Sequence, residues 1–143
     1  KGGMAFSNAS VTLIHGMSRP IGAHFHVPHG MSNAMLLPIV TAWSLPGAPE
    51  RYAQASRLMG FASDSDSEDR ALELLVTGLT QLCTDLAVPT PRAFGISEAD
   101  WFGIVDTMAA QAIASGSPAN NPRVPDHPQI MALYEQVWQT EVV

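Results

Sequence analysis

The sequence predicts an all-α fold of about six helices, joined by short loops and packed as a single helical domain over residues 1–143. Three observations support this prediction. Apolar residues recur at steps of three and four along most of the chain, which is typical of helices with one buried face. Proline and glycine fall where such helices would start or end. No segment shows the alternating apolar and polar residues of a β-strand.

The first helix is expected over residues 6–17, in the stretch FSNASVTLIHGM. Ser7 or Asn8 is a suitable N-cap, because a short side-chain oxygen there can accept a free backbone N–H. Pro20 and Gly22 are expected to end or kink this helix, since proline lacks the N–H that a helix interior needs.

Two further helices are expected before residue 62. One starts at Gly30 or Ser32 and runs to residue 43, with a kink at Pro38. The other covers residues 49–61, with a proline in its first turn and Gly60 at its C-terminal end.

The clearest helix is predicted over residues 66–86. Ser65 and Glu68 have the spacing of a capping box, and the acidic residues beside them suit a helix N-terminus. The stretch DSDSED therefore starts a helix; it lacks the glycine and glutamate that a calcium-binding loop needs. Five leucines recur at alternating steps of three and four and are expected to face the core: Leu72, Leu75, Leu79, Leu82 and Leu86.

Two helices complete the chain. A proline-bearing connector over residues 87–95 leads to a helix over residues 97–115, with Ser97 as N-cap and Gly116 beyond its end. The last helix follows Asp126, its expected N-cap, and reaches residue 139. Its inward-facing residues are expected to be Ile130, Leu133, Tyr134 and Val137.

Composition argues against several classes of function. The net charge is -6 and only 7 residues are Lys or Arg, whereas nucleic-acid binding needs clustered cations. The longest apolar run, AMLLPIV, is far too short to cross a bilayer, so no membrane partner is expected. The single cysteine, Cys83, is expected to be a buried thiol and fits a reducing, cytoplasmic location. Charged residues make up only 14%, so another domain or a partner is expected to cover part of the surface.

Four of the five histidines lie in HGMSRPIGAHFHVPHG, residues 15–30. Imidazole is a common ligand of divalent transition metals. His15 lies late in the first predicted helix and His29 stands just before the next, while His24 and His26 alternate in the connector. No two of them have the i, i+4 spacing of a ligand pair on one helix, so surface or capping histidines are an alternative. The helix start that follows them offers another alternative, an anion site.

The stretch MAFSNASVTLIHGMSRPIGAHFHVPHGMSNAMLLP resembles a characteristic region of the iron-containing (group III) alcohol dehydrogenases. In that family, His-G/A-M-x-x-P-x-G-A leads to P-H-G-x-x-N-A-x-L-L-P. AVPTPRAFGISEAD, and ANNPR followed by IMALYEQVW, resemble later parts of the family in the same order. The resemblance covers nearly the whole chain. It implies the all-helical C-terminal domain of a two-domain enzyme whose N-terminal α/β domain binds NAD or NADP.

The resemblance also implies a metal site of one Asp and three His, which holds iron(II) or sometimes zinc in the cleft between the domains. His15 and His29 match two of these ligands. The family's other two ligands come from an upstream D-x-x-x-H helix, and no aspartate of this chain is followed by histidine four residues on. A glycine-rich pyrophosphate loop is absent as well, and the chain begins at Lys1 rather than at methionine. We therefore expect the cofactor domain and the ligand helix to lie upstream.

One position departs from the family pattern. Many relatives carry a second histidine near the nicotinamide, four residues after the first ligand, where this chain has Arg19. Arginine cannot act as a neutral base at ordinary pH. Arg19 is therefore expected to meet an anionic cofactor phosphate or a substrate carboxylate. His26 is expected to line the substrate cleft, and His24 is expected to face solvent.

The leading hypothesis is the metal-binding C-terminal domain of an NAD(P)-dependent alcohol dehydrogenase. Such an enzyme interconverts small alcohols and aldehydes or ketones by hydride transfer, with iron(II), or zinc, as Lewis acid. The parent enzyme is expected to be a homo-oligomer, and this chain alone is expected to be inactive. Two alternatives are a non-catalytic helical interaction module with incidental histidines, and a zinc-dependent relative similar to glycerol dehydrogenase.

Overall fold

The computed structural model describes Met4 and residues 11–140, and these residues form helices and connections without a β-strand. The predicted all-α class is therefore confirmed. Ser7 and Asn8, the expected first N-caps, lie outside the described residues. The elements are α2 (Leu13–Phe25), α3 (His29–Ser44), η1 (Leu45–Gly47), α4 (Pro49–Leu58), α5 (Glu68–Asp85), α6 (Pro91–Phe94), α7 (Glu98–Ala114), η2 (Ser117–Asn120) and α8 (His127–Gln139).

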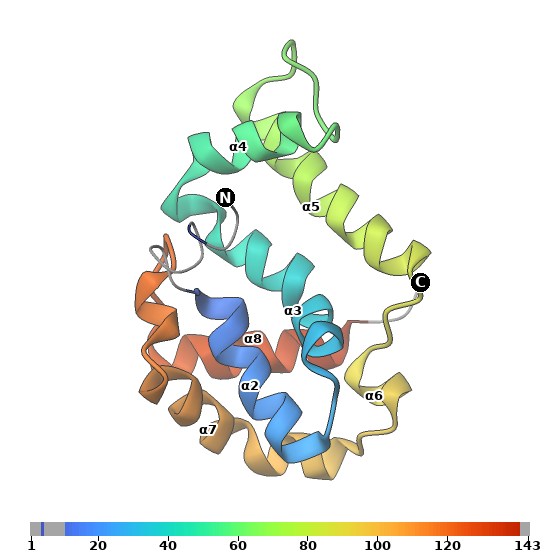
Figure 1. Cartoon of the computed structure of the whole chain (residues 1–143), viewed down its shortest axis with the longest axis vertical. Helices are drawn as coiled ribbons and strands as arrows, with labels where there is room; N and C mark the ends of the chain where they lie inside the picture. Colours follow the sequence, from blue (N-terminus) through green and yellow to red (C-terminus); the bar gives the residue numbers. More distant parts are fainter. Residues whose placement is uncertain (1–3, 5–10, 141–143) are drawn as a thin grey trace.

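Helices α2, α3, α7 and α8 surround the main core, and α4 and α5 extend from one end of this body (Figure 1). Trp101 of α7 is fully buried at the centre and donates its indole N–H to the carbonyl of Tyr134 at 3.2 Å. The Tyr134 hydroxyl donates to the carbonyl of Met17 at 2.7 Å, and burial raises its pKa. Since buried polar groups need partners, these bonds let two large aromatic side chains join α2, α7 and α8.

Helix α2 passes through Pro20 and ends at Phe25, so the expected termination at Pro20 or Gly22 is wrong. A proline inside a helix costs about 3 kcal/mol. Met17 and Ile21 are completely buried on the same helix, and each contributes about 1.5–3 kcal/mol by leaving water. The burial of the apolar face therefore outweighs the proline. His26 then ends the helix in a left-handed conformation, with φ of 56°.

Helix α3 begins at His29, slightly before the expected start at Gly30 or Ser32, and contains Pro38 as an interior residue. Its far end is tied to the loop after η2. Asn121 donates to the Ser44 hydroxyl at 2.9 Å, and Arg123 donates to the Trp43 carbonyl at 2.8 Å. The Arg123 guanidinium also lies 4.1 Å from the centroid of the Trp43 ring. These contacts fix the end of α3 through a cation–π pair and buried hydrogen bonds.

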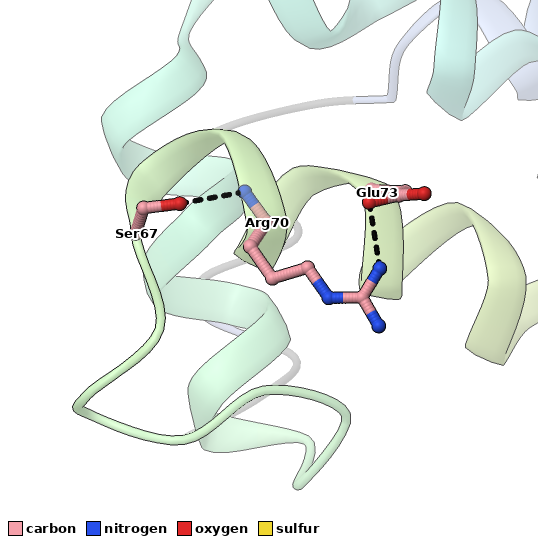
Figure 2. Close-up of polar contacts among 3 residues, drawn as sticks. All are labelled: Ser67, Arg70 and Glu73. Atoms are coloured by element: carbon pink, nitrogen blue, oxygen red, sulfur yellow. Dashed lines mark hydrogen bonds and ion pairs between the residues drawn. The ribbon is translucent and has the colours of Figure 1, made fainter.

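Helix α5 starts two residues later than its predicted capping box implies. Figure 2 shows Ser67 as the N-cap, where its hydroxyl accepts the backbone N–H of Arg70 at 3.1 Å. The Arg70 side chain then pairs with Glu73 at 2.7 Å. The expected Ser65–Glu68 capping box is therefore wrong, because residues 63–66 form their own turn, in which Asp66 accepts the N–H of Ser63. Both partners of the ion pair are exposed, so it contributes little to stability.

The leucine stripe of α5 is only partly buried. Leu75 and Leu79 are buried, as predicted, but Leu82 is 41% exposed and Leu86 is 68% exposed. The expectation that all five leucines face the core is wrong for these two. The second half of α5 still contacts α3, because the Cys83 thiol donates to the Ala34 carbonyl at 3.6 Å. Cys83 is half-buried rather than buried, and burial raises the pKa of its thiol.

The last two long helices follow their predictions. Ser97 accepts the backbone N–H of Asp100 and caps α7, and Gly116 lies beyond its end with φ of 77°. Asp126 and Gln129 form a capping box at the start of α8. The connector over residues 87–95 contains the short helix α6. Among the described residues, no helix is long and apolar enough to cross a membrane.

Candidate metal centre

His15 of α2 and His29 of α3 lie against each other, with ring centroids 4.4 Å apart and the ring planes at 72°. The path of the chain explains how two residues fourteen positions apart come into contact. From His15 to Phe25 the helix advances about 15 Å. The segment after α2 then runs back alongside it before α3 begins (Figure 1). Three residues, His26, Val27 and Pro28, join the two helices, and His29, the first residue of α3, comes to lie against His15.

The start of α2 is held in place by η2. A Cβ atom on Gly16 would lie 2.9 Å from Cδ of Pro118, so glycine allows this close approach. Asn120 donates its amide to the Val11 carbonyl at 3.1 Å, just before α2 begins. Packing and a hydrogen bond from a distant part of the chain therefore position the helix turn that carries His15.

The pKa of His15 lies below its ordinary value of 6.5. Burial is the largest cause, followed by the neighbouring His29 imidazole and the Arg19 guanidinium one turn along α2. All three disfavour the imidazolium. His15 is therefore neutral at pH 7, which is the form that can bind a metal through a ring nitrogen.

Nε2 donates a hydrogen bond in His24 and accepts one in His29. Nε2 of His24 donates to the Gln111 side-chain oxygen at 2.9 Å, because that oxygen can only accept. Nε2 of His29 accepts from the Asn33 side-chain amide at 3.2 Å, because that NH₂ group can only donate. At His29, Nε2 therefore carries a lone pair, which accepts the Asn33 amide. At His24, Nε2 carries the ring proton instead.

A hollow of about 450 Å³ opens beside the histidine pair. Its walls are mostly apolar, with a few polar groups: Val11, Thr12, Ile14, His15, Gly30, Asn33, Ala34 and Leu37. An apolar hollow with a neutral imidazole at its edge can take the alkyl part of a small molecule and present a nitrogen ligand beside it.

The other candidate residues lie farther along α2. Arg19 is exposed one turn after His15, and it lies close enough to lower the pKa of that histidine. His26 is exposed at the opposite end of α2, and no contact with the pair brings it to the hollow. His24 faces solvent, as predicted. The structure therefore brings His15 and His29 together and places His24 and His26 away from them, at the far end of α2.

The two histidines are of a type that binds transition metals, but two ligands do not complete a metal site. Two imidazoles whose ring centroids lie 4.4 Å apart are suitable ligands for iron(II) or zinc. No group of three or more His, Cys, Asp or Glu that could hold a metal occurs in the part of the chain that the structure describes. A stable protein site needs more ligands than this pair. Sequence reasoning did not identify Asn33, whose signal was its position four residues after His29 on one helix.

Comparison with known proteins places these features in a family. The family model described as "Fe-containing alcohol dehydrogenase family, C-terminal" matches residues 2–138. The 1,3-propanediol dehydrogenase of Citrobacter freundii is 34% identical over 137 residues, which cover 95% of this chain and 34% of that protein. The NADPH-dependent butanol dehydrogenase of Clostridium saccharobutylicum is 32% identical, covering 98% of this chain and 36% of that protein.

Solved structures agree with these matches. A crystal structure of 1,3-propanediol oxidoreductase has a TM-score of 0.85 and 33% sequence identity, covering 94% of this chain and 35% of that one. An alcohol dehydrogenase from Oenococcus oeni has a TM-score of 0.84 and 32% identity, covering 94% and 34%. The chain therefore spans about a third of the length of the relatives that it matches.

Proposed function

The chain belongs to the iron-containing alcohol dehydrogenase family as its C-terminal helical domain, and from this premise we propose that it supplies half of the metal site of an NAD(P)-dependent alcohol dehydrogenase. The observation that supports the proposal is the contact between His15 and His29, whose ring centroids are 4.4 Å apart. The reaction proposed for the whole protein is the interconversion of a small alcohol and its aldehyde or ketone.

His15 and His29 would hold the metal, iron(II) or zinc. Bound there, it would act as a Lewis acid that polarises the oxygen of the substrate while hydride passes to or from the nicotinamide. The residues of this chain provide the setting for that chemistry. His15 stays neutral because burial and nearby positive charge lower its pKa, and His29 presents the lone pair of Nε2. The apolar hollow beside them would bind the alkyl part of the substrate and exclude water from it.

Arg19 would line the cleft one turn from His15 and meet an anionic group, either a cofactor phosphate or a substrate carboxylate. A guanidinium binds both groups with paired hydrogen bonds. His26 would stand at the outer rim of the same cleft, since it lies at the opposite end of α2.

A preceding domain would supply the remaining two ligands and the dinucleotide site. The chain on its own would then neither retain one equivalent of metal nor oxidise alcohols. Assembly into a homo-oligomer and a cytoplasmic location stay predictions for the whole protein. The family match favours the enzyme over a non-catalytic interaction module.

The test compares the complete protein with the isolated chain. Both are supplied with iron(II) or zinc under reducing conditions, and then assayed with propanol, butanol and 1,3-propanediol and with NAD⁺ or NADP⁺. We expect alcohol-dependent reduction of one nicotinamide cofactor by the complete protein only. Metal analysis of the active protein would identify iron or zinc. A complete protein that oxidises none of these alcohols with either metal would contradict the proposal.

A further inference from the structure

Asn33 contacts the ring nitrogen of His29 from one turn farther along α3. Its side-chain amide donates to Nε2 at 3.2 Å. Residues four apart on a helix lie on the same face, so the regular backbone of α3 presents these two side chains to each other. Asn33 also lines the hollow beside His15.

The direction of this hydrogen bond defines the state of His29. An NH₂ group has no lone pair to offer, so Nε2 must be the acceptor. In this arrangement Nδ1, and not Nε2, carries the ring proton of His29. The lone pair through which this nitrogen would bind a metal is the same one that accepts the Asn33 amide, and it cannot serve both at once.

Packing does not explain Asn33. Its side-chain oxygen is buried and has no hydrogen-bond partner among the described residues. A buried polar atom without a partner destabilises a fold, and an apolar side chain there would avoid that penalty. An asparagine that disfavours stability and touches a proposed ligand is better explained by its contact with His29.

We propose that Asn33 is a positioning residue that occupies the ligand nitrogen of His29 in the metal-free protein and gives up that nitrogen when the metal binds. This inference rests on the proposed metal centre. Its consequence has a definite sign: a contact that exists only in the metal-free state opposes binding, so its removal strengthens binding. A residue that supported the ligand in the bound state would have the opposite effect.

The experiment measures zinc binding by the complete protein in competition with a chromophoric chelator. Asn33→Leu removes the amide and keeps the branching of the side chain. Gln111→Leu is the control, because Gln111 also hydrogen-bonds an imidazole, in the opposite direction and outside the proposed site: its side-chain oxygen accepts from His24. We expect Asn33→Leu to lower the zinc dissociation constant by about 2- to 10-fold, the range of one net hydrogen bond. Gln111→Leu should leave the constant unchanged.

A second measurement follows the contact itself in the metal-free protein. Nitrogen-15 chemical shifts should show His29 with its proton on Nδ1. Asn33→Leu should increase the population of the other tautomer, in which the proton is on Nε2. Asn33→Ala should repeat both effects if leucine disturbs folding. Zinc affinity that is unchanged or weakened in Asn33→Leu would overturn the inference. If the unmodified protein bound no zinc or iron, the proposed function would fail, and unaltered His29 shifts in the variant would separately refute the role of Asn33.

Discussion

The imidazoles of His15 and His29 lie 4.4 Å apart between ring centroids, although they belong to different helices and two other histidines lie between them in the sequence. The contact depends on the exposed turn at His26 and on the return of the chain along α2. It concentrates two nitrogen ligands at the edge of an apolar hollow. The other histidines of the same stretch are directed elsewhere.

Gly47, at the end of η1, should not tolerate one added methyl group. A Cβ on Gly47 would lie 2.5 Å from the carbonyl carbon and oxygen of Pro122, and this backbone is held by Asn121 and Arg123. Gly47→Ala should therefore destabilise the protein by about 1–3 kcal/mol through overpacking. Urea unfolding of the complete protein measures the change.

Gly103 provides the matched control for this substitution. It lies inside α7, and a Cβ there would meet nothing within 4 Å. Gly103→Ala should stabilise the protein by about 0.5–1 kcal/mol, because alanine is the better helix former. Equal effects of the two substitutions would show that the close approach at Gly47 is not tight.

Stability should depend on pH through His15. Because the folded-state pKa lies below 6.5, the unfolded chain takes up the proton first as the pH falls. The contribution of neutral His15 is therefore complete above about pH 6.5 and is lost as the pH falls toward the lower folded-state pKa. His15→Gln should reduce the fall in the unfolding midpoint of the metal-free protein between about pH 7.5 and pH 5.5. An identical decline in the variant would exclude His15 as its source.

Arg19 should affect the binding of an anion rather than the fold. Its side chain is exposed, so Arg19→Ala should leave the unfolding midpoint nearly unchanged. Loss of a hydrogen bond to a charged group should raise KM about tenfold or more for the ligand that carries the anion. Steady-state kinetics with NAD⁺, NADP⁺, neutral alcohols and hydroxycarboxylates would identify that ligand.

Arg51→Ala on α4 is the control for this comparison, because Arg51 is likewise exposed but lies on a helix that does not contribute to the hollow. If Arg19→Ala changed KM no more than Arg51→Ala for every ligand, the proposed anion contact would be refuted.

Local chemistry made much of the fold predictable. The caps at Ser97 and Asp126 depend on residues only a few positions apart, so their spacing in the sequence predicts them correctly. The exposure of Leu82 and Leu86 could not be predicted in this way, because it depends on which elements pack against α5. Pro20 was misjudged for the same reason: the buried face of α2 lies against α3 and α7, and this packing outweighs a local preference.

The site was less accessible from the sequence. The spacing of the four histidines indicated no ligand pair, because no two stand four apart on one helix. Resemblance to the family singled out His15 and His29, and the structure supplies the physical reason: the chain turns back at His26, and α3 begins with His29 against His15. The partner of His24, Gln111, lies in another helix and appears only in three dimensions, whereas Asn33 lies four residues after His29 on the same helix.

The most direct test of the central claim is the metal content of single-histidine variants of the complete protein. His15→Ala and His29→Ala should each lose nearly all bound metal after dialysis against a weak chelator, while His24→Ala should retain the same amount as the unmodified protein. Atomic absorption measures all three. Full retention of metal by both His15→Ala and His29→Ala would contradict the assignment of this pair as half of the metal site.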